Sequence, residues 1–521
     1  MKSDRKARKG RGTVAAAAPP EGGLRIGFLV AGVAILAVYL LASYFLIWDF
    51  GPVDDAFITF RYARNLAAGE GLGFNPGERV EGYSSLSWTL LLALGDALGL
   101  DLPDLSRVLG LALGAGTLLL LLFASWARPP ARLLTAGLLA VWLPGAYHFL
   151  NGLETALTAF LVTALVAVPR KGWVHHLAGA LLVLTRPEGF LAVLLWALSS
   201  WLAGRRSRPR HEMGVALTAA ACFLGQTAFR WLYHGDWIAN SARAKLLPLA
   251  MALPRGLADL GRFAFEGAGY GTLALLALAA FFLGRPAGTS RELRAACWFL
   301  ALFGAALAAG GGDSFPLWRF YVPLAPVLFL CAAQGLDLLL RRRQAPLVLA
   351  ALALLAALCL PCRGFLQRME REAHWRDQWV ATGKRLAAVM PPGTTIALCP
   401  VGALPFYSGL PAVDMLGLND RHIARVRPDR RYWYPGHHRH DAGYVLSRQP
   451  DLVMLANGPV VREPRDFPWM EVRAYERDLA RHPRFRAEYR LIHVPLEPPW
   501  FVQLFARREF LEEAGDLPGV L

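Results

Sequence analysis

Long apolar runs separated by short polar segments occupy the first 360 or so residues of the chain. The run from Leu24 to Trp48 carries no charge after Arg25, and Leu109–Trp126 and Phe320–Leu336 are nearly as apolar. Runs of about 17–25 apolar residues are long enough to cross the hydrocarbon core of a bilayer. The pattern therefore predicts a polytopic α-helical membrane protein, with the lipid bilayer as its first partner.

Twelve apolar segments are candidates for membrane-spanning helices. The segment at 85–100 is the shortest and carries Asp96 near its end, and it has no partner in an alternating in–out topology. We therefore expect about 11 transmembrane helices, with a range of 9–13. The candidates are 24–48, 85–100, 105–127, 132–149, 153–169, 173–186, 187–203, 212–232, 269–284, 295–310, 319–340 and 345–361.

The charge distribution supports this interpretation. The chain is 55% apolar and only 18% charged, with a formal net charge of +16. Its basic residues gather in short loops such as 128–132, 170–171, 205–210, 285–294 and 341–343, which is typical of the cytoplasmic side of spanning helices. This placement argues against nucleic acid as a partner. Residues 1–23 form a basic tail that we expect to be disordered and cytoplasmic.

The composition changes after Pro361, where the apolar runs end. Short strand-like runs at Thr395–Leu398 and Asp451–Leu455 follow a helical pattern at Trp375–Val389. We predict three parts: the tail at 1–23, a transmembrane domain at 24–361 with a first outer loop at 49–84, and a soluble α/β domain at 362–521. The predicted topology places the last domain outside the cytoplasm.

Two adjacent carboxylates, Asp54 and Asp55, lie six residues after the first predicted helix. Acidic groups beside a membrane are costly unless a cation, a substrate or water accepts them. One interpretation is a general base that deprotonates an acceptor hydroxyl. The other is a solvated loop in which both acids balance Arg61 and Arg64. The spacing favours neither.

The string from Asp54 to Tyr83 resembles the first outer loop of the bacterial terminal arabinofuranosyltransferase family, whose members are GT-C membrane glycosyltransferases. Further similar strings follow in the same order along nearly the whole chain. Ala239 departs from the family's proline before Asn240, and His438 stands where an acidic residue is usual. These strings are Gly152–Thr155, Thr185–Gly189, Gly311–Asp313 with Arg319-Phe320, Pro405–Leu410, Asp414–Asp420 and Pro435–His437.

The resemblance implies a polyprenyl-phosphate sugar donor and an acidic general base in the first outer loop. The base is then Asp54 or Asp55, and we favour Asp54. The resemblance also implies two supporting sets of residues. The donor phosphate set is Arg186, Arg319, Lys245 and Arg61, and the acceptor or second-shell set is Glu81, Glu154, Glu188, Asp313, Asn240 and Tyr83.

Simpler structural roles compete with these assignments. Each arginine or lysine at a helix end also fits a side chain that reaches from the apolar zone to the membrane surface. Glu188 follows Pro187 and is expected to cap a helix N-terminus, with pairing to Arg186 as an alternative. No metal ligand set is expected, although the aspartate pair leaves a divalent cation open.

We therefore expect an inner-membrane bacterial glycosyltransferase, multi-pass, with a cytoplasmic N-terminus and a periplasmic C-terminal domain. It would transfer a sugar, arabinofuranose-like in the first instance, to a cell-envelope glycan or glycolipid. Some relatives are flagellar-motor control proteins, so a non-enzymatic assembly or regulatory factor is the main alternative. A lipid or solute transporter is a second alternative, but most charges lie at helix ends and not at the midplane.

Overall fold

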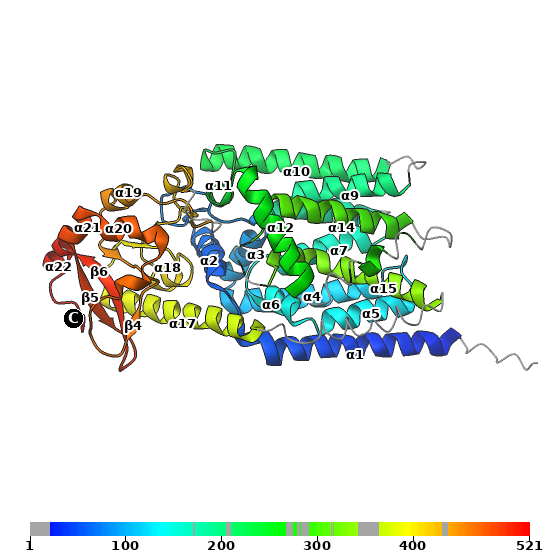
Figure 1. Cartoon of the computed structure of the whole chain (residues 1–521), viewed down its shortest axis with the longest axis horizontal. Helices are drawn as coiled ribbons and strands as arrows, with labels where there is room; N and C mark the ends of the chain where they lie inside the picture. The colour runs from blue at the N-terminus through cyan, green and yellow to red at the C-terminus, as the bar shows by residue number, and fades with distance from the viewer. Residues whose placement is uncertain are drawn as a thin grey trace, which may run out of the picture.

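The protein consists of a helical bundle and a C-terminal domain that follow one another along the longest axis of the molecule (Figure 1). The computed structural model describes residues 21–169, 172–204, 210–266, 291–341 and 364–521, except 314, 316 and 430–435, together with residues 273, 275–278 and 282. Residues 1–20 of the predicted tail at 1–23 and the predicted segment at 345–361 lie outside the described residues, as does most of the segment at 269–284. Residues 21–23 of the predicted tail are helical and begin α1.

The bundle is built from apolar helices. Among the described residues, five helices are long and apolar enough to cross a membrane: Ile26–Phe50, Leu102–Leu122, Arg210–His234, Arg291–Ala309 and Arg319–Arg341. A sixth candidate is a pair bent by 64° between Ala140 and Leu143, and four apolar helices are shorter. These ten features match ten of the twelve predicted segments, so the number of spans stays a prediction. The helices are α1 (Glu21–Ile47), α2 (Asp54–Ala67), α3 (Leu86–Ala97), α4 (Leu102–Leu122), α5 (Pro129–Ala140), α6 (Leu143–Leu150), α7 (Thr155–Ala167), α8 (Trp173–Thr185), α9 (Gly189–Ala203), α10 (Arg210–His234), α11 (Asn240–Lys245), α12 (Leu249–Glu266), α14 (Arg291–Ala309) and α15 (Ala325–Arg341), with short 3-10 turns η1 (Trp48–Phe50) and η3 (Arg319–Leu324).

The first outer loop contains a helix that its sequence did not predict. Helix α2 has a polar first turn and then buries one side chain after another, among them Phe57 and Phe60. Phe57 packs against Phe406 and Tyr407, with ring centroids 5.4 and 5.6 Å apart. Both partners belong to α18 (Ala403–Ser408) of the C-terminal domain. Apolar contact with that domain therefore holds the loop in a helical conformation.

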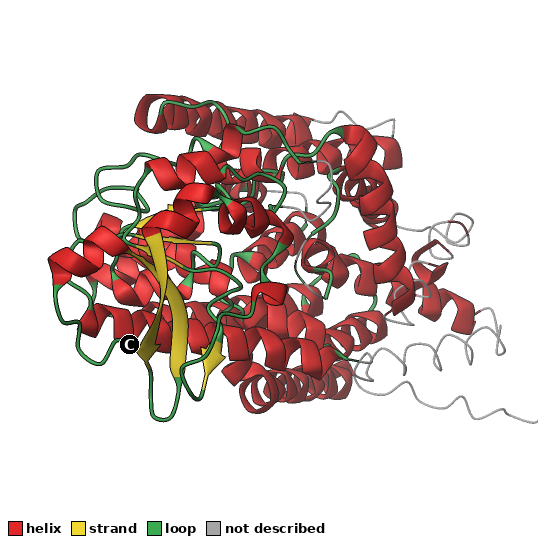
Figure 2. Ribbon diagram, turned by 60° about the vertical axis from the view of Figure 1, so that its left-hand side comes forward, coloured by secondary structure: helices red, strands yellow, loops and turns green. Residues whose placement is uncertain are grey.

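The C-terminal domain contains a small mixed sheet flanked by helices (Figure 2). Its strand order is β2-β1-β3-β6-β4, with β5 also paired to β6. Strand β1 runs parallel to β2 and β3, whereas β6 is antiparallel to β3, β4 and β5. The strands are β1 (Ile396–Leu398), β2 (Ala412–Asp414), β3 (Leu452–Val453), β4 (Val460–Val461), β5 (Tyr489–Pro495) and β6 (Phe501–Arg507); the other elements are α17 (Phe365–Val389), η4 (Ile423–Arg425), α19 (Ala442–Ser447), η5 (Trp469–Glu471), η6 (Ala474–Glu476), α20 (Arg477–Arg481), α21 (Pro483–Glu488) and α22 (Arg508–Ala514).

The predicted strands at 395–398 and 451–455 correspond to β1 and β3, and the predicted helix forms the second half of α17. Helix α17 begins ten residues earlier than the pattern indicated. Its first turns point back toward the bundle, and Arg376 donates hydrogen bonds to the carbonyl oxygens of Pro52 and Asp49 at 3.2 and 3.1 Å. The two parts of the molecule are therefore joined through polar as well as apolar contacts.

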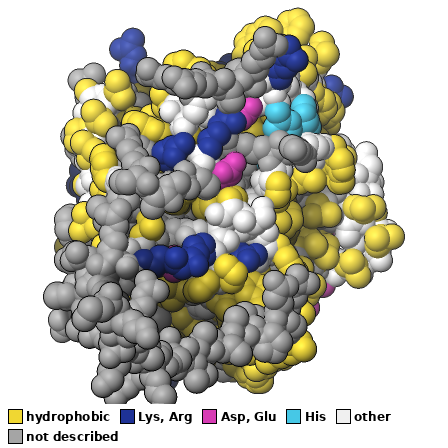
Figure 3. Space-filling view, turned by 90° about the vertical axis from the view of Figure 1, so that its right-hand side faces the viewer, with side chains coloured by type: hydrophobic (Ala, Val, Ile, Leu, Met, Phe, Trp, Pro, Cys, Tyr) yellow, Lys and Arg dark blue, Asp and Glu magenta, His cyan; other side chains and the backbone are white. Residues whose placement is uncertain are grey.

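Basic side chains gather at the end of the bundle that faces away from the C-terminal domain (Figure 3). Arg128 pairs with Asp337 at 3.0 Å, and Arg291 pairs with Glu212 at the same distance. Arg294 donates to the carbonyl oxygen of Ala203 at the end of α9. The described basic loops that led us to predict a cytoplasmic face thus share one end of the molecule.

Candidate active site

Two adjoining cavities lie where the bundle meets the C-terminal domain. The main cavity has a volume of about 380 Å³ and extends between α2, α17 and the loops of the C-terminal domain. The side cavity, of about 130 Å³, extends into the bundle between α2, the 82–84 segment and the ends of α8 and α11. Asp55, Lys245 and Leu418 line both cavities. The junction of the two spaces therefore brings a carboxylate and an ammonium group together.

The two predicted aspartates occupy the first turn of α2, where the positive end of the helix favours negative charge. They face different surroundings. Oδ1 of Asp54 accepts a hydrogen bond from the N–H of Ala403 at 2.7 Å, so this carboxylate is held against the C-terminal domain. Gly402 permits the approach, because a Cβ there would lie 2.0 Å from the Asp54 carbonyl oxygen. Asp54 lines only the main cavity, whereas Asp55 faces both.

Burial raises the pKa of Asp54 to about 7, even though the Ala403 N–H bond lowers it, and repulsion from Asp55 adds to the rise. Glu372 on α17 behaves similarly: burial raises its pKa to about 7, and Asp55 is the next cause. Three carboxylates thus meet at one wall of the main cavity. Groups whose pKa lies near neutrality suit proton transfer at physiological pH.

Helix α17 supplies a stripe of cavity residues that sequence reasoning missed. Glu372, Trp375 and Trp379 all line the main cavity, at spacings of three and four residues that place them on one face of the helix. That spacing was visible in the sequence, but no sequence pattern indicated that this face of the helix lies beside Asp55. The same wall also includes Cys399 and Arg473, which were not predicted either.

The side cavity holds the predicted arginines in ion pairs. Arg186 donates to Glu154 at 2.6 Å and to Glu188 at 2.8 Å, and its side chain is only 11% exposed. Glu188 occupies the N-cap position of α9, as expected, but its side chain makes no capping hydrogen bond there and pairs with Arg186. Arg186 is buried among acidic partners, which argues against a side chain that simply reaches for the membrane surface.

Arg319 forms the second ion pair of this region. Its guanidinium donates to both oxygens of Asp313 at 2.6 and 3.0 Å, and both side chains are buried. Burial raises the pKa of Asp313, but Arg319 and then Lys245 and Arg186 outweigh it and bring the pKa below its ordinary value. Asp313 thus experiences three cations, all of which line the side cavity, although Asp313 itself does not.

Helix α11 places Lys245 at the junction of the two cavities. Within the part of the chain that the structure describes, this ammonium has no hydrogen bond or ion pair, whereas both arginines are paired. Asn240 begins the same helix and does not line either cavity. Its amide donates to the carbonyl oxygens of Gly417, Leu418 and Asp420, so it fixes the segment that carries Leu418.

Two further predicted site residues, Arg61 and Glu81, lie outside both cavities. Arg61 is buried outside both cavities, and its guanidinium donates to the carbonyl oxygens of Phe74, Pro405 and Leu410. Such contacts do not leave it placed to bind the donor phosphate, so that assignment is corrected. Glu81 pairs with Arg230 and also lies outside the cavities.

Tyr83 does line the side cavity, and its hydroxyl contacts Nε2 of His234 at 3.2 Å. Among the described residues, no group of three or more His, Cys, Asp or Glu side chains is arranged to hold a metal ion. The main cavity offers carboxylates for a cation without a complete ligand set, and we assign no step to a metal.

Comparison with known proteins gives the fold a counterpart. The apo structure of ArnT from Cupriavidus metallidurans matches 95% of this chain and 100% of that chain, with a TM-score of 0.54 and 14% identity. The chain therefore shares the fold of ArnT. ArnT bound to undecaprenyl phosphate is also similar, with 13% identity, coverage of 76% of this chain and 86% of that one, and a TM-score of 0.48.

Sequence comparison covers a smaller part of the chain. It is 31% identical over 180 residues to the terminal beta-(1->2)-arabinofuranosyltransferase of Mycobacterium tuberculosis, which is 34% of this chain and 24% of that protein. The chain thus spans about a quarter of the length of this curated relative. Residues 367–509 match a family described as a domain of unknown function, DUF8728. That match covers most of the C-terminal domain.

Proposed function

We propose that the chain is a membrane glycosyltransferase that moves a sugar from a polyprenyl-phosphate carrier to a glycan or glycolipid acceptor. The observation that carries the proposal is the shared wall of the two cavities, where Asp55 and Lys245 face the same space. The GT-C fold supports it, as does the name of the arabinofuranosyltransferase relative. ArnT, the protein with the similar fold, has been solved with undecaprenyl phosphate bound.

Asp55 is the general base in this proposal, in place of Asp54, which we favoured from sequence. The carboxylate of Asp54 is engaged by the Ala403 N–H, whereas Asp55 opens onto both cavities. Asp55 takes the proton of an acceptor hydroxyl as the hydroxyl oxygen attacks the anomeric carbon. The bond from that carbon to the phosphate oxygen breaks, and polyprenyl phosphate leaves with the electron pair. Glu372 is close to Asp55, and burial followed by repulsion from Asp55 raises the pKa of Glu372 to about 7.

The cations of the side cavity stabilise the leaving phosphate. Lys245 is the first ligand, because it faces the junction without an ion-pair partner among the described residues. Arg186 and Arg319 add fixed N–H donors beside it. A guanidinium has five N–H donors, so Arg319, held by one carboxylate, and Arg186, held by two, both keep donors for a phosphate oxygen. Their buried ion pairs hold them in place before the substrate arrives. Electrostatic stabilisation is most effective when the stabilising groups are already oriented in this way.

We further propose that the cavities open on the periplasmic side of a bacterial inner membrane and that the acceptor is a cell-envelope glycan. The support is the gathering of basic loops at the opposite end of the bundle, as expected for a cytoplasmic face. An arabinofuranose-like sugar is the first candidate because of the relative's name.

The test is transfer by purified protein supplied with a panel of polyprenyl-phosphate sugars, with release of polyprenyl phosphate as the readout. We expect Asp55→Asn to lower the rate at least about 100-fold, as loss of a general base does. Asp49→Asn is the matched control, since Asp49 precedes the same loop, is exposed and lines neither cavity. Near-normal turnover by Asp55→Asn would show that this carboxylate is not the base.

The regulatory alternative makes a different prediction. A chain that acts only as an assembly or motor-control factor keeps its cellular effect in the Asp55→Asn variant and loses it when residues 363–521 are removed. A chain that acts as the proposed enzyme loses the effect in both cases. The pair of variants therefore separates the two functions in cells, even before the donor sugar is identified.

A further inference from the structure

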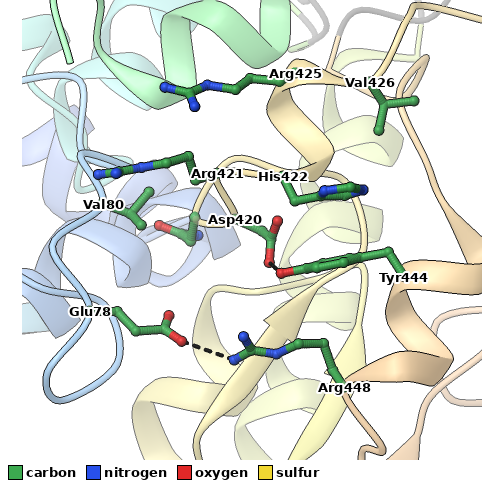
Figure 4. Close-up of a pocket in the computed structure, with 10 residues that line it drawn as sticks. Glu78, Val80, Asp420, Arg421, His422, Arg425, Val426, Tyr444 and Arg448 are labelled. Carbon is green, nitrogen blue, oxygen red and sulfur yellow. Dashed lines mark hydrogen bonds and ion pairs between the residues drawn. The ribbon is translucent and has the colours of Figure 1, made fainter. Parts of the chain in front are cut away.

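A third cavity, larger than the two at the candidate active site, opens on the other side of the same wall. We call it the outer cleft; it has a volume of about 500 Å³ and is lined by Glu78 and Val80, by residues 419–422 with Arg425 and Val426, and by Tyr444 and Arg448. The side chains come from the first outer loop, the segment that ends in η4, and α19 (Figure 4). None of them was predicted as a site residue. The volume lies within the range of about 300–1,000 Å³ typical of small-ligand sites.

Two chain segments separate the outer cleft from the catalytic cavities. Along the first, Glu78 and Val80 face the cleft while Gly82 and Tyr83 face the side cavity. The second segment places Leu418 in the catalytic cavities and Asn419 in the cleft. The cleft therefore adjoins the proposed active site across a wall two segments thick.

Tyr62 ties these two segments together. Its hydroxyl donates to the carbonyl oxygen of Val80 at 2.7 Å, accepts from the N–H of Gly82 at 2.9 Å and lies 3.3 Å from Oδ1 of Asn419. The tyrosine is fully buried. The wall is therefore fixed, and a ligand in the cleft has a defined position relative to Asp55.

The lining of the cleft is polar, and its charges nearly balance. Eight of its ten lining residues are polar or charged, whereas sites for apolar ligands are lined mostly by hydrophobic side chains. Arg448 pairs with Glu78 at 3.0 Å, and Arg425 pairs with Asp236 at 2.7 Å. Arg421 donates to two backbone carbonyl oxygens and lines the cleft together with the carboxylate of Asp420. A site for an anionic ligand needs a clear excess of positive charge, and one arginine set against one carboxylate does not supply it.

What such a surface does offer is closely spaced donors and acceptors. A sugar hydroxyl both donates and accepts, and therefore suits a wall in which guanidinium and carboxylate groups alternate. Tyr444 donates to Oδ2 of Asp420 at 2.8 Å, and Nε2 of His422 lies 2.9 Å from Oδ2 of Asp441. These contacts hold the polar groups in fixed positions around the opening.

The cleft also has a flat aromatic platform. The rings of His422 and Tyr444 stack at 4.0 Å with an interplanar angle of 15°, and about half of the His422 side chain is exposed (Figure 4). Stacked rings offer a rigid amphipathic surface on which the apolar face of a pyranose or furanose ring packs. An aromatic surface for the sugar ring, next to hydrogen-bonding groups for its hydroxyls, is what a saccharide-binding site requires.

From the polar lining, the nearly balanced charges and the aromatic platform, we infer that the outer cleft binds a neutral oligosaccharide. Its position behind the wall makes it a subsite for the part of a glycan acceptor that lies away from the reacting hydroxyl. That second role rests on the proposed glycosyl transfer, whereas saccharide binding in the cleft does not. The chain would accordingly prefer polymeric acceptors to single sugars.

The test is binding of a neutral arabinofuranosyl hexasaccharide and of an oligogalacturonate of equal length to the purified full chain, by saturation-transfer NMR and calorimetry. We expect the neutral ligand to bind and His422→Ala and Arg448→Gln each to weaken it about five- to tenfold, as loss of one or two contacts does. Arg484→Gln is the matched control. The side chains of Arg448 and Arg484 are 46% and 45% exposed, and each pairs with a glutamate, but Arg484 lies on α21 away from the cleft.

Each outcome of the binding experiment either supports or overturns the inference that the cleft binds a neutral oligosaccharide. Equal weakening by Arg484→Gln, tighter binding of the oligogalacturonate, or no binding of the neutral ligand would overturn the inference. Asp55→Asn separates it from the proposed function, because that variant keeps the cleft intact and should bind the hexasaccharide like the parent chain. If the parent chain binds the hexasaccharide but transfers no sugar, the inference about the cleft is supported and the proposed glycosyl transfer is contradicted.

Discussion

Arg61 is expected to act as a structural link between the first outer loop and the C-terminal domain. Its guanidinium donates to the carbonyl oxygens of Phe74 at 2.7 Å, Pro405 at 2.7 Å and Leu410 at 2.9 Å. The variant Arg61→Met keeps apolar volume but leaves three buried carbonyl groups without these donors, each at about 1–3 kcal/mol. The summed loss is about 3 kcal/mol or more.

In a cooperative unit the size of the C-terminal domain, each kcal/mol shifts Tm by about 2–4 °C, so Tm should fall by about 6 °C or more. The measurement is thermal unfolding of the purified protein in detergent, followed by intrinsic fluorescence. Arg64→Met is the matched control on the same helix. Arg64 donates to one carbonyl oxygen, that of Phe406, so its loss should lower Tm by about a third as much. An unchanged Tm together with a raised KM for the donor would refute this reasoning and restore Arg61 to the phosphate site.

Three further predictions concern single positions. In the folded state, burial raises the pKa of Asp54 to about 7. The stability that its protonated form contributes is therefore complete below about pH 4 and is lost as pH rises through 7. The Tm of Asp54→Asn relative to that of the parent should rise between pH 5 and 8, and a Tm difference that stays constant with pH would contradict this. Gly82→Ala places a Cβ 1.9 Å from Oδ1 of Asn419 and should cost about 1–3 kcal/mol in thermal unfolding, so a neutral result would mean that the wall yields easily. Arg186→Met leaves Glu154 buried without its cation and should lower the free energy of unfolding by about 3–5 kcal/mol. The double variant with Glu154→Met should recover the Tm but not sugar transfer. Recovery of both would give Arg186 a structural role only.

The sequence was sufficient to predict the division into a helical bundle and a C-terminal α/β domain. Apolar length and loop charge depend on local composition, which is why α1 and α4 were found within a few residues of their bounds. Helix α2 was missed because its helical state depends on packing of Phe57 against Phe406, and the two lie about 350 positions apart in the chain. No local pattern records such a contact.

The candidate site was predictable in part for the same reason. Arg186, Lys245 and Arg319 do line the side cavity. Arg186 follows the apolar helix α8 and Arg319 precedes the apolar helix α15, so their places could be found from apolar length, whereas Lys245 was named from the family resemblance. Glu372 was not found, since its place beside Asp55 depends on the angle at which α17 meets the bundle. Charge alone also misassigned Arg61, because a buried arginine held by backbone carbonyl groups and one aimed at a phosphate look alike in sequence.

The contacts between α2 and α18 also have a mechanical consequence. The rings of Phe57 and Phe60 lie 5.4 and 6.0 Å from that of Phe406, and Asp54 accepts from the first residue of α18. A domain fastened at the turn that carries the carboxylates moves as one body with that turn. Access to the two cavities is therefore governed by the side chains and loops at their rims, and not by travel of the whole domain.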